Sequence, residues 1–127
     1  MILTKQKTKL LKMTNNEKYL VVGAGSISKR HIANIKILNK NSTVLNLSSS
    51  GRDIDPDSNK ADYFLRHFDE IQQHKLNAVV IASPATFHLK HALFFSELNI
   101  PLLIEKPLSD RMTRYEEASH ILTDINK

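Results

Sequence analysis

A glycine-rich turn is the first feature of the chain that could bind a ligand. Gly23 and Gly25 stand two positions apart, between the apolar run 20–22 and a helical pattern. Gly23 permits a tight turn, and Gly25 has no Cβ, so a pyrophosphate can approach the backbone there. The N–H groups and the positive dipole end of the helix then favour the anion. Ser28 takes the third position of this fingerprint, usually Gly or Ala, and a Gly-x-Gly alone is a weak signal.

The loop after the predicted strand 43–47 bears on which dinucleotide would bind. In NAD sites, an acidic residue about 20 positions after the glycines binds the ribose 2′-hydroxyl. Here Ser48, Ser50 and Arg52 occupy that stretch, and the aspartates that begin at Asp53 come too late to take this role. Hydroxyls and a guanidinium suit a 2′-phosphate, because arginine offers it a charge-assisted fork. We therefore expect NADP rather than NAD, and the alternative is an ordinary Ser/Gly loop with a solvated arginine.

The motif Glu105-Lys106-Pro107 directly follows a buried apolar run and contains the candidate catalytic residue. Oxidation of an alcohol by hydride transfer also requires a base that takes the hydroxyl proton. Lys106, at a strand end, could be this base, or the donor to the carbonyl in the reverse direction. The alternative is a lysine whose ammonium simply extends from the strand end into solvent.

The elements that must position these residues alternate along the chain. Aliphatic runs predict strands at 19–22, 43–47, 63–65, 77–82 and 101–104, and the patterns between them predict helices at 26–39, 68–74 and 86–98, with a last helix after Ser109. This alternation predicts an α/β fold with a doubly wound parallel sheet, a three-layer Rossmann fold in a single domain. In such a sheet, ligands bind at the carboxyl ends of the strands, where the three candidate segments lie.

The helix after the glycine turn is predicted to pack on the sheet through one apolar stripe. Ile27, His31, Ile35 and Leu38 recur at helical spacing and form this stripe, with Ile32 at its edge. Ser28 falls within it, where a small residue allows close packing of the helix against the strand.

Composition limits the classes of function. The chain has 127 residues, of which 41% are hydrophobic and 24% charged, as expected of one globular domain. No apolar run approaches the roughly 18 residues that span a bilayer. With no cysteine, the chain can hold neither a disulfide nor thiolate-bound zinc. We therefore expect a cytoplasmic protein with no membrane partner.

The formal net charge of +5 does not indicate a nucleic-acid partner. Lys5, Lys7, Lys9 and Lys12 supply 4 of the 18 basic residues, so that 14 remain against 13 acidic residues from position 13 onward. No clustered basic face with interleaved aromatic residues is present, and nucleic acid is not expected to bind. Residues 1–17 are predicted to be disordered or an upstream extension, which leaves 18–127 as the domain.

Three stretches together resemble one known family. They are Val-Gly-Ala-Gly-Ser-Ile-Ser-Lys-Arg-His at 22–31, Ala-Val-Val-Ile-Ala-Ser-Pro-Ala-Thr-Phe-His at 78–88, and Leu-Leu-Ile-Glu-Lys-Pro-Leu-Ser at 102–109. Their order and spacing resemble the Gfo/Idh/MocA oxidoreductases, named for glucose–fructose oxidoreductase, inositol dehydrogenase and MocA. The resemblance covers most of residues 18–110, and the Glu-Lys-Pro motif after a buried strand is its most specific part.

The resemblance implies an oxidoreductase that transfers a hydride between NAD(P) and a hydroxyl of a sugar or cyclic polyol. It implies two groups of cofactor contacts. Those to the pyrophosphate come from Gly23, Gly25, Ser26 and Ile27, and those on the nicotinamide side come from Ser83, Pro84 and His88.

By the same resemblance, Glu105 and Lys106 lie near the nicotinamide ribose, and Lys106 reaches toward the substrate hydroxyl. Pro107 fixes the backbone behind them, at a point where the family often shows an unusual peptide geometry. Arg30 and His31 also match the family, and we expect this pair to pack or cap locally.

The family has a second domain, which forms the substrate pocket and contributes a helix with an Asp-x-x-x-His pattern. This chain ends at Lys127, and Asp124 has no histidine four residues later. The resemblance therefore covers the cofactor half, and we expect an incomplete catalyst whose substrate site comes from a further domain or a partner chain. The alternative is a stand-alone dinucleotide-binding or interaction module. His88 and His91 have no third ligand at helical spacing, so no metal is expected.

Overall fold

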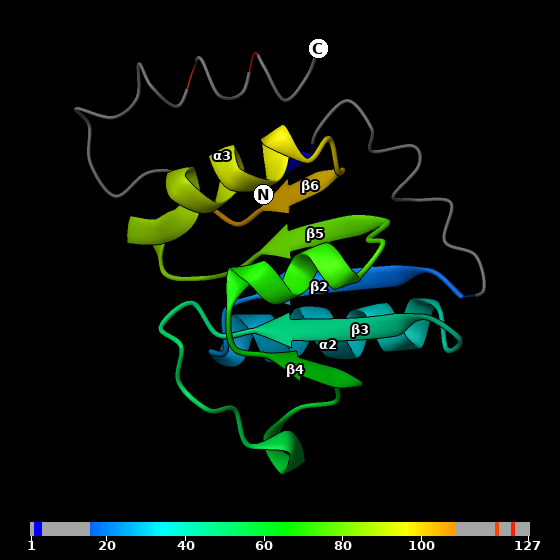
Figure 1. Ribbon diagram of the computed structural model, residues 1–127. Coiled ribbons are helices and arrows are strands. Elements are labelled where there is room, and N and C mark those ends of the chain that lie inside the picture. The colour runs from blue at the N-terminus through cyan, green and yellow to red at the C-terminus, as the bar shows by residue number, and fades with distance from the viewer. Residues whose placement is uncertain (1, 4–15, 109–118, 120–122, 124–127) are drawn as a thin grey trace.

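A six-stranded sheet forms the centre of the computed structural model, which describes residues 2–3, 16–108, 119 and 123 (Figure 1). The strands are β1 Ile2–Leu3, β2 Lys18–Val22, β3 Thr43–Leu47, β4 Tyr63–Leu65, β5 Ala78–Ile81 and β6 Leu102–Ile104. Their spatial order is β1-β6-β5-β2-β3-β4. Strands β2 to β6 run parallel, which confirms the predicted sheet. The edge strand β1, which the sequence did not predict, pairs antiparallel with β6.

Helices cover both faces of the sheet. One face packs against α2 Ser26–Leu38, and the other packs against α3 His88–Glu97 and a 3-10 helix at Phe68–Gln73 (Figure 1). Shorter 3-10 turns occur at Pro56–Ser58 and Ala85–Phe87, so the helix predicted from 86 starts as a 3-10 turn. The helix predicted after Ser109 falls outside the described residues. Within the described part of the chain, no helix has both the length and the apolar character needed to cross a membrane.

The central strands bury both of their faces, which explains their continuously apolar sequences. Leu20 and Val22 of β2 point into one core together with Phe95 of α3. Tyr19 and Val21 point into a second core on the opposite face, under α2. Successive side chains of a strand alternate between faces, so each central strand is packed against a core on both sides. The carboxyl ends of the strands are therefore held in fixed positions.

The helix α2 packs through a face that shares Ser28 and Ile35 with the predicted stripe and is otherwise rotated from it. Its buried residues are Ser28, Ile32 and Ile35, whereas Ile27 of the predicted stripe is 38% exposed and Leu38 is 71% exposed. The stripe was therefore right at Ser28 and Ile35 and wrong at Ile27 and Leu38, because the buried face is centred nearer Ile32. The reason is the close approach of α2 to the sheet, which admits the small side chain of Ser28 and excludes a large one.

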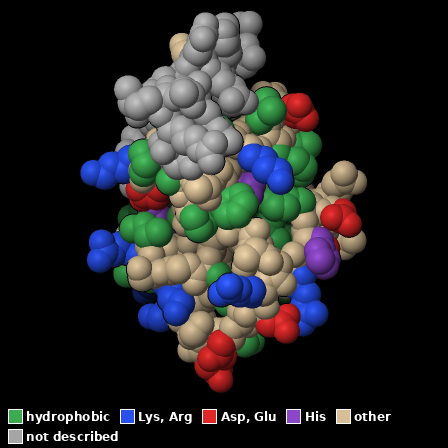
Figure 2. Space-filling view, turned by 90° about the vertical axis from the view of Figure 1, so that its left-hand side faces the viewer, with side chains coloured by type: hydrophobic (Ala, Val, Ile, Leu, Met, Phe, Trp, Pro, Cys, Tyr) green, Lys and Arg blue, Asp and Glu red, His purple; other side chains and the backbone are tan. Residues whose placement is uncertain are grey.

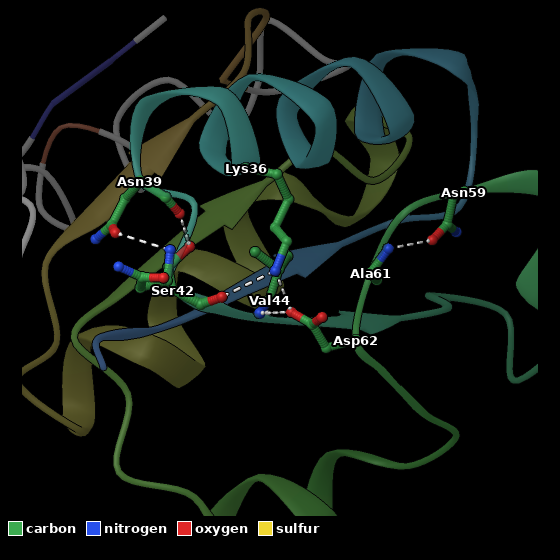
Figure 3. Close-up of polar contacts among 8 residues, drawn as sticks. Lys36, Asn39, Ser42, Val44, Asn59, Ala61 and Asp62 are labelled. Atoms are coloured by element: carbon green, nitrogen blue, oxygen red, sulfur yellow. Dashed lines mark hydrogen bonds and ion pairs between the residues drawn. The ribbon is translucent and has the colours of Figure 1, made fainter. Parts of the chain in front are cut away.

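A network of polar contacts fixes the connection from α2 through β3 to β4 (Figure 3). The Asp62 carboxylate accepts from Lys36 Nζ and from Val44 N–H, each at 2.8 Å. Lys36 Nζ also donates to Ser42 O at 2.9 Å. These contacts anchor the amino end of β3, at the end of the sheet away from the glycine turn.

Candidate functional site

The carboxyl ends of β2 and β5 mark the point where the strand order reverses. From β2 the sheet continues through β3 to β4 on one side and through β5 to β6 on the other. The loops that leave β2 and β5 diverge there, and sheets of this type bind ligands at such a point. Figure 2 looks onto this edge of the molecule, where apolar side chains lie beside basic ones.

Gly23 makes the turn at the end of β2. Its φ of 114° lies in the left-handed region, and a Cβ there would come within 2.6 Å of Ala82 O. Neighbouring strand β3 holds the residue from both sides, because Gly23 N–H donates to Leu47 O at 2.7 Å and Gly23 O accepts from Asn46 Nδ2 at 2.7 Å. The turn therefore requires glycine for its conformation and for its packing.

Gly25 follows the turn and precedes α2. Its backbone is extended, with φ −83° and ψ −172°, and no atom lies within 4 Å of the place a Cβ would take. No side chain caps α2, and its first turn contains no acidic residue. The N–H groups at the start of α2 thus produce a positive local field, and the space above Gly25 is open. Both features suit an anion.

A hollow of about 410 Å³ opens beside Gly25. It brings together five residues predicted for the site, which are Gly25, Ser48, Ser50, Arg52 and Pro84. The glycine turn, the loop after β3 and the loop after β5 therefore share one cavity.

Asp53 and Asp55 also line this hollow. Asp53 pairs with Arg66 at 2.7 Å, and Asp55 Oδ1 accepts from Asp57 N–H at 3.0 Å. Both carboxylates thus have partners, whereas Arg52 has no hydrogen bond or ion pair within the described ranges.

A second hollow, of about 290 Å³, lies next to the first and shares Ser49 with it. Its other lining residues are mostly aromatic: Phe68, Phe87, Lys90, His91 and Phe94. The rings of Phe87 and His91 are stacked, with centroids 5.6 Å apart and planes 11° apart. Burial, together with repulsion from Lys90 and His88, lowers the pKa of His91 to about 4, so its ring is neutral at pH 7. This aromatic hollow therefore suits a flat, uncharged ring.

Two histidines of α3 fix the loop after β5. His91 Nδ1 lies 2.9 Å from Ser83 Oγ. His88 is 2% exposed, with Nε2 2.5 Å from Ser83 O and Nδ1 2.6 Å from Pro107 O. Ser83 and His88, which the resemblance placed on the nicotinamide side, thus lie beneath the surface of the site, and Pro84 lies at the surface.

Glu105 reaches a partner on α2. Its Oε1 lies 2.7 Å from His31 Nε2, and the two side chains are 15% and 13% exposed. Burial alone would raise the pKa of Glu105, but the hydrogen bond and the charge of His31, with the Lys106 N–H, lower that pKa below its usual value. The expectation that His31 packs or caps within its own helix was wrong, because the pair links α2 to the end of β6.

We expect His31→Ala to destabilise the fold by about 1–2 kcal/mol near pH 6. Because the pKa of Glu105 is lowered in the folded state, this pair stabilises the fold above the unfolded pKa of about 4.3 and loses its effect as the pH falls through the lowered value. Urea unfolding should therefore show a difference from wild type that shrinks between about pH 6 and about pH 3.

The matched control for this experiment is Arg66→Ala. It breaks a pair whose side chains are 65% and 76% exposed, so its cost should stay below about 1 kcal/mol. A His31→Ala effect as large at the acid end as at the neutral end would contradict the role given to the Glu105 carboxylate.

The remaining predicted residues line neither of these two hollows. Ser26 and Ile27 line a smaller hollow of about 180 Å³ with Arg30. Lys106 and Pro107 are exposed, and the peptide bond between them is cis. The Lys106 ammonium has no hydrogen bond or ion pair in the part of the chain that the structure describes. In that part, no three His, Cys, Asp or Glu side chains gather as metal ligands would.

Asn46 is a site residue that the sequence analysis missed. Its amide Nδ2 donates to Val21 O at 2.8 Å and to Gly23 O at 2.7 Å, and its Oδ1 accepts from Asn59 Nδ2 at 3.2 Å. The residue is 0% exposed. A signal was present, because a polar residue inside the apolar strand Thr43–Leu47 must find buried partners.

The fold and the site define a Rossmann domain of the kind that binds nicotinamide dinucleotides. Residues 17–127 match the model of an oxidoreductase family with an NAD-binding Rossmann fold. The match covers most of the chain, and the chain therefore belongs to this family, the Gfo/Idh/MocA oxidoreductases. Among curated proteins, no sequence matches the chain.

Several solved enzymes share the fold. The scyllo-inositol dehydrogenase from Lactobacillus casei is 24% identical with a TM-score of 0.69, over 89% of this chain and 35% of that one. The myo-inositol 2-dehydrogenase from Lactobacillus plantarum is 15% identical with a TM-score of 0.70, over 87% and 34%. The WlbA dehydrogenase from Bordetella pertussis, solved with NADH and UDP-GlcNAcA, is 20% identical with a TM-score of 0.67, over 89% and 33%. This chain spans about a third of the length of these enzymes.

Proposed function

We propose that this chain is the cofactor-binding part of an oxidoreductase that transfers a hydride between NAD(P) and a hydroxyl of a sugar or cyclic polyol. The observation that carries the proposal is the hollow at the switch point, which joins Gly25, the loop from Ser48 to Arg52, and Pro84. This position suits the diphosphate and ribose of a dinucleotide. The substrate class is supported by the similarity to two inositol dehydrogenases and to an enzyme solved with NADH and UDP-GlcNAcA.

Each part of the dinucleotide has its own place in this proposal. The pyrophosphate lies over the first turn of α2, beside Gly25, with Ser26 and Ile27 at its rim. The adenine enters the aromatic hollow, because a flat base stacks well on neutral rings. The nicotinamide end lies toward Pro84 and Lys106, above the buried Ser83 and His88.

Lys106 is the proposed acid–base residue. When bound, the nicotinamide accepts or supplies the hydride. Lys106 Nζ, in its neutral form, takes the hydroxyl proton as the alcohol is oxidised, and its ammonium returns that proton to the carbonyl oxygen in the reverse direction. Because the chain spans about a third of the similar enzymes, we propose that a further domain or a partner chain supplies the substrate pocket.

Calorimetric titration of the chain with NADH and with NADPH tests the cofactor assignment. The proposal expects saturable binding of at least one of them, with an affinity that falls when Gly25 is replaced by a larger residue. If neither dinucleotide gives heat at millimolar concentration, the remaining hypothesis is an interaction module that has the fold and does not bind the ligand. A turnover of any polyol by the isolated chain would contradict the proposed need for a second part.

For the choice between the dinucleotides, we propose that Arg52 binds the 2′-phosphate of NADP. The guanidinium is exposed and lines the first hollow, and Asp53 beside it is already paired with Arg66. Arg52→Ala should therefore weaken NADPH binding about tenfold and leave NADH binding within about twofold. Lys60→Ala, which removes the same charge from an exposed residue outside both hollows, is the control. An equal loss for NADH and NADPH in Arg52→Ala would exclude the 2′-phosphate contact.

A further inference from the structure

The buried ring of His88 connects two loops that come from different strands. Ser83 follows β5 and Pro107 follows β6, and each presents its backbone carbonyl to one ring nitrogen of His88. The last backbone hydrogen bond between these two strand ends, in the described part of the chain, runs from Glu105 N to Ile81 O at 2.9 Å. Beyond that point, the His88 ring joins the two loops.

The hydrogen bonds of this ring require two donors. A carbonyl oxygen can only accept, and a neutral imidazole has one N–H, so it can satisfy one carbonyl and not two. If Nε2, 2.5 Å from Ser83 O, and Nδ1, 2.6 Å from Pro107 O, both donate, each nitrogen must carry a proton, and both hydrogen bonds are then charge-assisted.

The neighbouring histidine behaves differently in the same helix. His91 is neutral, since burial and repulsion from Lys90 and His88 lower its pKa to about 4. Its Nδ1 meets a hydroxyl, Ser83 Oγ, which can donate or accept, so a single ring proton satisfies the contact. Within three residues of His88 or Pro107 in the described part of the chain, the charged groups besides His91 are Lys90, Glu105, which is paired with His31, and Lys106.

The two loops held by His88 carry the residues that the proposed function places around the nicotinamide. Pro84 directly follows Ser83 and lines the first hollow, and Lys106 directly precedes Pro107. A ring that binds both carbonyls fixes the separation of these loops. The position of Lys106 relative to Pro84 therefore depends on a side chain that the cofactor itself does not need to touch.

We propose that His88 is a positioning residue that donates from both ring nitrogens and so holds the Ser83–Pro84 loop and the Lys106–Pro107 loop at a fixed separation. The effect of His88 on cofactor binding rests on the proposed function, whereas its hydrogen bonds to the two loops do not depend on that function. His88 thus acts through the two carbonyls, beneath the dinucleotide, and orders the loops before any ligand binds.

Nitrogen-15 NMR of the full chain without ligand tests the hydrogen bonding directly. At neutral pH, both ring nitrogens of His88 should show a directly bonded proton, and His91 should show one protonated nitrogen. The signals are assigned from their loss in His88→Gln and His91→Gln. A His88 ring with a single protonated nitrogen would overturn the proposal, whether or not the chain binds a dinucleotide.

Two substitutions then test the positioning role. His88→Phe keeps a flat ring without donors, and we expect the backbone amide signals of both Ser83 and Lys106 to shift and the affinity for the dinucleotide that binds wild type to fall about tenfold. His88→Gln keeps one donor group and should lose less. His91→Phe removes the contact to Ser83 Oγ and should leave the Lys106 amide signal in place.

The outcomes separate this inference from the proposed function. Unshifted Lys106 signals and unchanged affinity in folded His88→Phe would overturn the positioning role. If His88→Phe does not fold, the same comparison is made with His88→Gln. If wild type binds no dinucleotide, the proposed function fails, and the nitrogen-15 spectra and the Lys106 amide shifts still decide whether His88 joins the loops.

Discussion

Replacing Gly23 by alanine is expected to destabilise the fold by about 3 kcal/mol or more. A side chain is strained at a φ of 114°, and the added methyl would lie 2.6 Å from Ala82 O and 2.8 Å from Ser28 Oγ. Ala82 cannot easily withdraw, because its N–H donates to Val22 O at 2.9 Å and continues the pairing of β5 with β2. Equilibrium unfolding in urea, followed by circular dichroism, measures the loss.

Gly25→Ala is the matched control for this experiment. It adds the same methyl two residues later, where φ is −83° and no atom lies within 4 Å of the new Cβ. The free energy of unfolding should change by less than about 1 kcal/mol, and the affinity for dinucleotide should fall because the methyl enters the first hollow. An equal destabilisation by both substitutions would show that contact with the loop after β5 does not constrain Gly23.

The strands and the glycine turn could be predicted because their signals are local. The run 19–22 is continuously apolar, the run 43–47 is apolar or β-branched except at Asn46, and the structure forms β2 and β3 there with a difference of at most one residue. The small size of Ser28 predicted a close approach of helix and strand, and the residue is 0% exposed with its hydroxyl donating to Ala82 O at 3.3 Å. At these positions the local sequence preference agrees with the structure that forms.

The polar pairings could not be predicted, because they join residues that the chain brings together only after folding. His31 and Glu105 are 74 positions apart, and no local pattern connects them. The buried face of α2 was predicted only in part, since Ser28 and Ile35 are buried as expected, whereas Ile27 and Leu38 are exposed.

Asn46→Asp is expected to cost about 3 kcal/mol at neutral pH, as much as the change at Gly23. The substitution replaces an amide donor by a carboxylate oxygen, which would face the acceptors Val21 O and Gly23 O at 2.8 and 2.7 Å. The position is 0% exposed, so water cannot solvate the new charge. Burial raises the pKa of the introduced carboxyl, and its protonated form regains one donor, so part of the lost stability should return as the pH falls toward about 4.

Asn99→Asp makes the same chemical change at an exposed residue just beyond the C-terminus of α3, where a carboxylate meets the negative end of the helix, and should alter the free energy of unfolding by no more than about 1 kcal/mol at any pH. Urea unfolding of both variants at several pH values separates the cost of burying a carboxylate from the effect of replacing an amide by a carboxylate. Because Gly23 O is one of the two acceptors, Asn46→Asp should also weaken dinucleotide binding through the glycine turn, and Asn99→Asp should not. A stable Asn46→Asp variant with no pH dependence would mean that the amide does not hold the turn, and that the contacts around Gly23 suffice by themselves to fix the site.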